Sequence, residues 1–219
     1  MLINGAIGDQ FGASLEMMPA EIIKEKYTEE ELDNYIITEK TIDKPNTTTD
    51  DTQMTIAVYN AIKEYHRDIT NERLLLSYLK TFEPFRGYSM QTYNDFTNYI
   101  ENQENPTYKI NIRNSSYNGA LMRISPLIIL IMDIYNDNKS DLTNDIIRKY
   151  VEIIHYPTHI NEQAFDISIF YIKLLFLIIT KNNSMKTLYG FNKNLMCIVS
   201  TITDKAFYEK MTAIIELFE

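Results

Sequence analysis

The stretch TTTDDTQMTIAVYNAIKEY, residues 47–65, is the part of the chain that indicates its fold class most clearly. It starts with polar residues, and apolar residues then recur at roughly helical spacing from Met54 to Ile62. This pattern predicts an amphipathic helix over Thr52–Tyr65. Gly and Pro number only six each in the whole chain, so few sharp turns can be made and long helices are favoured. We therefore expect an all-α fold with functional loops between the helices.

Length and composition restrict the class of protein. The 219 residues, 45% of them hydrophobic, fit a single domain over residues 1–219 with a sizeable core. The net charge of -9 argues against general nucleic-acid binding, which needs clustered Lys and Arg, but it leaves room for one nucleotide held by backbone amides. Cys197 is the single cysteine, so we expect no internal disulfide, no Cys-based zinc site and a reducing, cytoplasmic compartment.

Further helices are predicted along the chain. Ser140 is a candidate cap for a helix with apolar residues between Ile146 and Ile154. The clearest helix is the last one, in which one apolar face carries Phe207, Met211, Ile214, Ile215 and Phe218.

The most apolar stretch of the chain is Phe165–Thr180. It contains Asp166 and Lys173 and is short for a membrane span, so it predicts a buried core helix, and we expect no membrane partner.

Two other kinds of segment are less regular. Tyr35–Thr38 and Lys109–Ile112 are short candidate strands. Residues 83–118 are rich in Tyr and Asn and contain two prolines, which predicts a long ordered loop. Loops of that length often carry function.

The polar start of the first quoted helix is the sharpest local feature. Asp50 and Asp51 follow Thr49, and two adjacent carboxylates repel one another unless a cation lies between them. Carboxylate and hydroxyl oxygens are hard ligands suited to Mg²⁺ or Ca²⁺. The alternative is an ordinary capped helix with a spare surface aspartate, because capping residues are common at helix starts.

Two more segments leave both a functional and a structural interpretation open. GAIGDQFGASLE, residues 5–16, places small residues at 5, 8, 12 and 13, which fits either a tight helix crossing or a phosphate site; taken alone, Glu16 reads as a surface residue. SSYNGALMR, residues 115–123, is a polar turn that enters an apolar helix. Its amides can hold phosphate oxygens, or it is an ordinary turn with Ser and Asn caps.

Taken together and in this order, these segments resemble the ADP-ribosylglycohydrolase family. The resemblance rests on GAIGDQFGASLE at 5–16, TDDTQM at 49–54, RGYS at 86–89, NGALMR at 118–123 and the Thr158-His159 pair, with Ala164 behind it. It covers residues 5–164. One departure within these motifs is Ser89, because the family usually has glycine there.

The resemblance implies an all-α fold, a magnesium site and hydrolysis of the bond between ADP-ribose and a modified group. By carry-over, the metal ligands are Thr49, Asp50 and Asp51, and the catalytic carboxylates are Glu16, Asp50 and Asp51. The implied substrate-binding residues are Gly87, Ser89, Ser115, Ser116, Asn118, Gly119 and His159. Without the resemblance, His159 reads as a hydrogen-bonded core histidine.

The family also has a late Gly-Gly-Asp-x-Asp-Thr type of motif, and no such string is found in residues 1–219. We therefore expect at most one Mg²⁺ ion in the isolated chain. Three functions follow. The first is a Mg²⁺-dependent hydrolase that removes ADP-ribose from a modified target. The second is an inactive ADP-ribose-binding or protein-interaction module. The third is one subunit of a split hydrolase whose partner chain completes the metal site.

Overall fold

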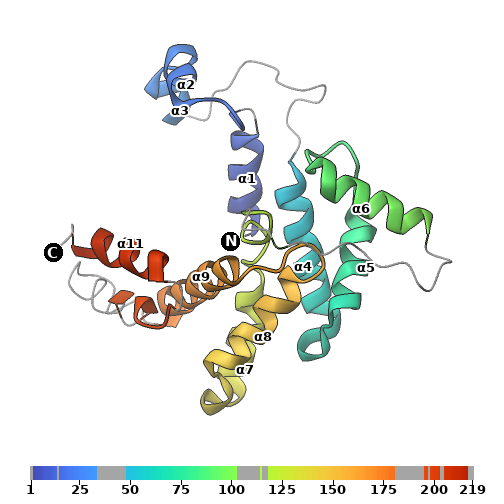
Figure 1. Ribbon diagram of the computed structural model, residues 1–219, viewed down its shortest axis with the longest axis vertical. Helices are drawn as coiled ribbons and strands as arrows, with labels where there is room; N and C mark the ends of the chain where they lie inside the picture. The colour runs from blue at the N-terminus through green and yellow to red at the C-terminus, as the bar shows by residue number, and fades with distance from the viewer. Residues whose placement is uncertain are drawn as a thin grey trace.

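The computed structural model describes residues 2–13, 15–33, 48–102, 114, 118–180, 195–196, 198–202 and 205–216. No β-strand occurs in these ranges, and the all-α expectation is confirmed (Figure 1). The helices are α1 (Leu2–Gly12), α2 (Ala20–Lys26), α3 (Glu29–Asp33), α4 (Asp50–Tyr65), α5 (Asn71–Thr81), α6 (Met90–Glu101), α7 (Leu127–Asp137), α8 (Asn144–His155), α9 (Glu162–Thr180) and α11 (Lys205–Glu216). Three short 3-10 turns are η1 (His66–Asp68), η2 (Asn118–Ala120) and η3 (Lys139–Asp141).

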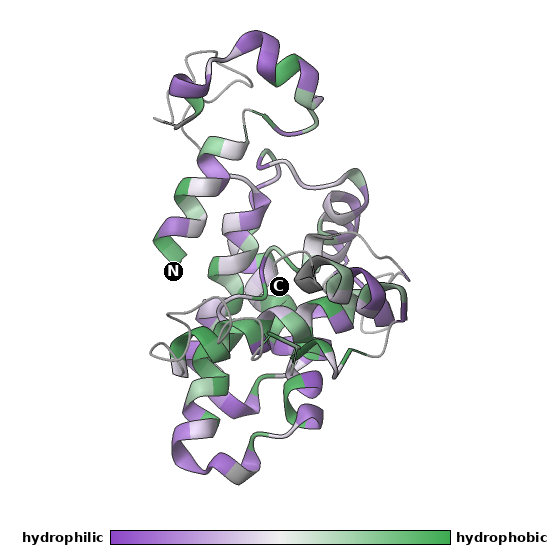
Figure 2. Cartoon of the chain, turned by 90° about the vertical axis from the view of Figure 1, so that its left-hand side faces the viewer, coloured by the Kyte–Doolittle hydropathy of each residue, from purple (hydrophilic) through white to green (hydrophobic). Residues whose placement is uncertain are grey.

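Helix α4 is the centre of the main core, as its sequence pattern predicts. Its small side chains Ala57 and Ala61 are fully buried, which allows α5 to pack closely along it. The core continues through Leu74 of α5, Leu130 of α7 and Val151 of α8, which are also fully buried. Figure 2 shows the hydrophobic residues gathered in this body, whereas α2 and α3, at the top of Figure 1, are mostly hydrophilic.

Helix α9 forms the base for a second, smaller apolar cluster. Leu195 and Val199 pack there against α9 and against Met211 of α11, and the Phe170 and Phe207 rings meet edge to face at 5.6 Å. The prediction of a C-terminal helix is confirmed, although the side chains of Ile214, Ile215 and Phe218 lie outside the described residues.

The expectation of a buried core helix at Phe165–Thr180 holds only for one side of α9. Asp166, Ser168 and Ile172 are buried, but Ile178 and Ile179 are exposed. Among the described residues, α9 is long and apolar enough to cross a membrane by length and composition alone, and 33% of its most apolar window is buried. The buried Ser168 hydroxyl lies 2.8 Å from Nε2 of His155, which is the packing of a core helix.

Two local predictions are wrong. Residues 83–118 do not form one long loop, because they contain α6. The Ser89 hydroxyl caps that helix by accepting the Thr92 N–H, and its Phe96 ring is fully buried. Ser140 does not cap α8 either; it lies in η3, and the Thr143 hydroxyl accepts the Ile146 N–H instead.

The candidate strands Tyr35–Thr38 and Lys109–Ile112 lie outside the described residues.

Candidate functional site

The N-terminus of α4 is held in place by a carboxylate from another helix. Thr49 is the N-cap residue of α4, and its hydroxyl accepts the Asp51 N–H. Asp9 of α1 accepts hydrogen bonds from the Thr49 amide (2.9 Å) and hydroxyl (2.6 Å), and from the Thr52 amide (3.3 Å) and hydroxyl (2.6 Å). Charge-assisted bonds of this kind are stronger than neutral ones. Asp9 therefore joins α1 to α4 and satisfies the free amides that Asp50 and Asp51 would otherwise cap.

The loop before α6 holds the other side of the same helix start. The Asp50 amide donates to the Arg86 carbonyl at 2.7 Å, and the Arg86 guanidinium donates to the Thr48 carbonyl at 3.1 Å. Gly87 follows with a φ of 88°, a backbone conformation that residues other than glycine rarely adopt. A Cβ on Gly87 would lie 3.6 Å from Oδ1 of Asp50, so this turn passes close to the carboxylate.

The carboxyl groups of Asp50 and Asp51 are freed from capping and partly withdrawn from water. Burial raises the pKa of Asp50 to about 7, and the negative charges of Asp51, Glu16 and Asp9 act in the same direction. Burial also raises the pKa of Asp51 to about 6, with the charges of Asp9 and Glu16 adding to it. The negative charges of the four carboxyl groups therefore repel one another, and a bound cation would reduce this repulsion.

A cleft of about 1180 Å³ opens beside this carboxylate group. One wall is α1, whose Gly5, Gly8 and Gly12 line the cleft. The sequence pattern allowed a tight helix crossing at these glycines, but a Cβ on any of them would meet no atom of the described residues within 4 Å. The small residues therefore leave open space beside Asp9 instead of bringing two helices together. Two apolar side chains of α1 are also exposed, Ile3 at 75% and Ile7 at 52%.

The opposite wall comes from the segment after α8 and from η2. His159 lies against Gly119, where an added Cβ would be 3.3 Å from Cε1 of the imidazole. Met122 joins this wall to α4, because its carbonyl accepts the Thr55 hydroxyl at 3.2 Å. Gly119 therefore allows His159 to approach closely, and His159 is a cleft residue. The core-histidine interpretation fits His155 better, because His155 is fully buried.

Most of the site residues expected from the sequence lie around this one cleft. The expected residues that line it are Glu16, Thr49, Asp50, Asp51, Gly87, Ser89, Gly119 and His159. Ser115 and Ser116 lie outside the described residues, and so does the side chain of Asn118, whose backbone begins η2.

Sequence reasoning missed Asp9. Its signal was present, because Asp9 is the one charged residue among the small and apolar residues of α1.

The residues that surround the carboxylate pair fit a single hard cation better than a complete dinuclear centre. Asp50 and Asp51 supply two carboxylates that repel each other at neutral pH, and the Thr49 hydroxyl, which donates to Asp9 and accepts one amide, retains a second lone pair. Within the described ranges, no three acidic, His or Cys side chains are grouped as metal ligands. Mg²⁺ often takes one or two carboxylates and keeps several waters, which matches this donor set.

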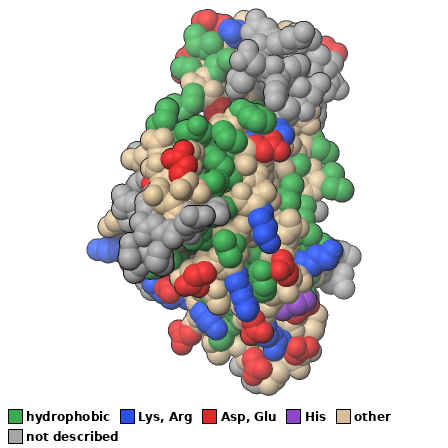
Figure 3. All heavy atoms as spheres, turned by 90° about the vertical axis from the view of Figure 1, so that its right-hand side faces the viewer, with side chains coloured by type: hydrophobic (Ala, Val, Ile, Leu, Met, Phe, Trp, Pro, Cys, Tyr) green, Lys and Arg blue, Asp and Glu red, His purple; other side chains and the backbone are tan. Residues whose placement is uncertain are grey.

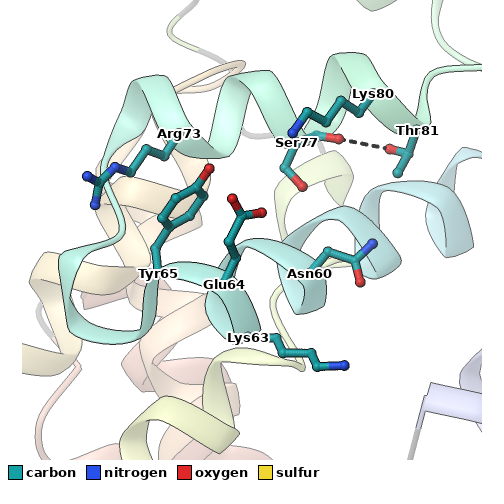
Figure 4. A pocket seen from close by; sticks show the side chains of 8 residues that line it. All are labelled: Asn60, Lys63, Glu64, Tyr65, Arg73, Ser77, Lys80 and Thr81. Atoms are coloured by element: carbon teal, nitrogen blue, oxygen red, sulfur yellow. Dashed lines mark hydrogen bonds between the residues drawn. The ribbon is translucent and has the colours of Figure 1, made fainter.

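A second hollow of about 400 Å³ lies between α4 and α5 at the other end of α4 (Figure 4). Its residues are Asn60, Lys63, Glu64, Tyr65, Arg73, Ser77, Lys80 and Thr81. Lys63, Glu64 and Lys80 are exposed, and the Arg73 guanidinium is held by the Asp68 carbonyl at 2.6 Å and by the Tyr65 ring. Similar mixing of basic and acidic side chains covers the lower part of the face in Figure 3. This hollow is therefore a solvated surface groove.

Comparison with known proteins agrees with the all-α fold. The ADP-ribosylglycohydrolase family profile matches residues 1–212 of the 219. The chain therefore belongs to the ADP-ribosylglycohydrolase family. A search of curated proteins finds no match.

Proposed function

We propose that this protein is a Mg²⁺-dependent hydrolase that removes ADP-ribose from a modified target. The observation that carries the proposal is the pair Asp50 and Asp51, desolvated and facing a large cleft in a member of this family. Perturbed carboxyl groups in a cleft are typical of functional sites. Glu16, which adds to their negative field, lines the same cleft.

The two walls of the cleft would have different roles, and the acidic wall would carry out the chemistry. Asp50, Asp51 and Thr49 would hold the cation, which orients the ribose hydroxyls and lowers the pKa of a bound water. Cleavage at the ribose C1 builds oxocarbenium character. Glu16 or Asp51 would accept a proton from the attacking water, whose oxygen becomes the new hydroxyl at C1. The same carboxyl group would then give that proton to the target group as its bond to C1 breaks.

The opposite wall would bind the substrate. His159 would contact the ribose, and the residues that would border the diphosphate are Gly87, Ser89, Ser115, Ser116, Asn118 and Gly119. The close approach of Gly119 to His159 supports this part of the proposal, because it brings the two residues together on one wall of the cleft.

A second candidate is a binding module that holds ADP-ribose without cleaving it. The scarcity of grouped metal ligands in the described ranges favours it. A subunit of a split hydrolase lies between these two functions. The isolated chain would then bind at most one cation and hydrolyse its substrate slowly, until a partner chain supplies further metal ligands.

Calorimetric titration with ADP-ribose, AMP and Mg²⁺ separates these functions, together with release of ADP-ribose from modified arginine or serine peptides. The hydrolase requires tighter binding of ADP-ribose than of AMP, and Mg²⁺-dependent release. Tight binding of ADP-ribose without release identifies the binding module. Equal affinity for both nucleotides, or none for either, contradicts a substrate cleft altogether. Two bound ions with brisk turnover contradict the limit of one cation.

A further inference from the structure

A buried arginine connects the core to the cleft histidine. Arg123 is 1% exposed, and its guanidinium lies 4.8 Å from the centre of the Tyr78 ring. One of its terminal nitrogens, Nη2, donates to the Ile154 carbonyl at 3.1 Å and to the Thr158 hydroxyl at 2.5 Å. That hydroxyl lies 2.6 Å from Nδ1 of His159. A continuous chain of hydrogen bonds therefore runs from the core to the cleft wall.

The proton positions in this chain follow from counting donors and acceptors. Arginine has only donors, so the Thr158 oxygen must accept from it. The hydroxyl has one proton, and it can go either to Nδ1 of His159 or to the His155 carbonyl. The carbonyl is 3.4 Å away and already accepts the amides of Thr158 and His159 at 3.0 and 2.8 Å. An O–H···O bond of 3.4 Å lies beyond the usual range.

The Thr158 proton therefore points to Nδ1, and Nδ1 is an acceptor. A neutral imidazole with an accepting Nδ1 carries its proton on Nε2. That nitrogen is on the side of Gly119, where an added Cβ would lie 3.6 Å from it, and His159 lines the cleft.

We propose that Arg123 and Thr158 are positioning residues that lock His159 in its Nε2–H tautomer and make it a hydrogen-bond donor toward the cleft. His159 then binds an acceptor oxygen, such as a sugar hydroxyl or a phosphate oxygen, and does not serve as the base that activates water. This leaves the proton-accepting role to the carboxylates on the other wall. The tautomer rests on the geometry alone, whereas the role toward ADP-ribose rests on the proposed function.

Nitrogen-15 NMR of the full chain at a pH where imidazole is neutral tests the tautomer directly. The His159→Asn spectrum assigns the signals of His159 among the three histidines. In the unsubstituted protein, we expect Nδ1 to resonate as an unprotonated nitrogen and Nε2 as a protonated one. Thr158→Val removes the hydroxyl with little change of shape, and the ring should become a mixture of both tautomers, as in free imidazole. Thr158→Ser is the matched control and should keep the original spectrum.

Two further measurements separate positioning from stability and from the proposed function. Thr158→Val should weaken ADP-ribose binding about 3–10-fold, the effect of one net hydrogen bond, and Thr158→Ser should restore it. Arg123→Met should shift the tautomer in the same direction as Thr158→Val; if it does not fold, the threonine pair still decides. A protonated Nδ1 in the unsubstituted protein, or an unchanged ring in Thr158→Val, overturns the proposal. Absence of ADP-ribose binding contradicts only the proposed function, because the tautomer is measured without ligand.

Discussion

The two ends of helix α4 carry acidic side chains in opposite circumstances. At the N-terminus, Asp50 and Asp51 are half-buried beside Asp9 and Glu16, and the pKa values of both are raised. At the other end, Glu64 lies exposed in a groove with basic side chains around it (Figure 4). A charge in water near an opposite charge costs little, whereas like charges withdrawn from water are unfavourable without a partner. A hollow is present at both ends of α4, so the gathering of like charges is what distinguishes the candidate site from the solvated groove.

The largest expected effect tests that difference directly. Asp50→Asn should lower both Mg²⁺ affinity and ADP-ribose release by about 10²-fold or more, because it removes a charged group while the Thr49 cap and the Asp9 bonds remain. Glu64→Gln is the matched control and should leave both unchanged. Calorimetry and a release assay measure the two effects. Equal losses in both variants would remove the distinction between the ends of α4.

The stability of the metal-free protein should fall as pH rises. Asp50 has a pKa of about 7 when folded and 3.8 in its reference state, so the folded chain binds more protons between these values. Stability is therefore greatest near the lower value, decreases as pH rises toward 7, and levels off above it, a loss of about 1–2 kcal/mol after solvent screening. Thermal unfolding with a chelator from pH 5 to 8 measures this loss.

Two comparisons check the cause of that pH dependence. Addition of Mg²⁺ should flatten the profile, because a nearby cation lowers both aspartate pKa values. Asp50→Asn should flatten it without metal. A profile that rises with pH in the metal-free protein would contradict the assigned shifts.

Gly87→Ala should destabilise the loop that holds the helix start by about 1–2 kcal/mol. The cause is the φ of 88°, since the new Cβ itself would make only an ordinary contact, 3.6 Å from Asp50. Denaturant unfolding gives the free energy. If the variant is as stable as the parent, the turn adopts another conformation in solution.

Gly8→Ala should have the smallest effect and the opposite sign. Its Cβ would meet no atom of the part of the chain that the structure describes within 4 Å, and alanine favours a helix over glycine by about 0.5–1 kcal/mol. The free energy of unfolding should therefore increase. Gly8→Leu should keep this stability but weaken ADP-ribose binding, because its side chain would project into the cleft. A destabilised Gly8→Ala would show that α1 packs against something at this face.

Local pattern was enough to predict several parts of the molecule. The spacing of apolar residues predicted α4 and the C-terminal helix, and the motif order predicted the family and several of the residues that line the cleft. Prediction from local pattern failed where tertiary contacts determine the secondary structure. The segment 83–118 looked like a loop because it is rich in Tyr and Asn, yet burial of Phe96 against the core stabilises α6 within it.

The helical class, the acidic helix start and the recurring glycines of the first helix can all be predicted from residue order, because periodicity and residue chemistry are local properties. What these features do depends on contacts between segments that are far apart in the chain. Asp9 and Asp50 are 41 positions apart, and only packing of α1 on α4 shows that Asp9 caps the helix start while Asp50 and Asp51 face the cleft. The glycines of α1 proved to border open space. The proton on His159 depends on Arg123 and Thr158, which meet only because burial brings α4, α8 and the cleft wall together.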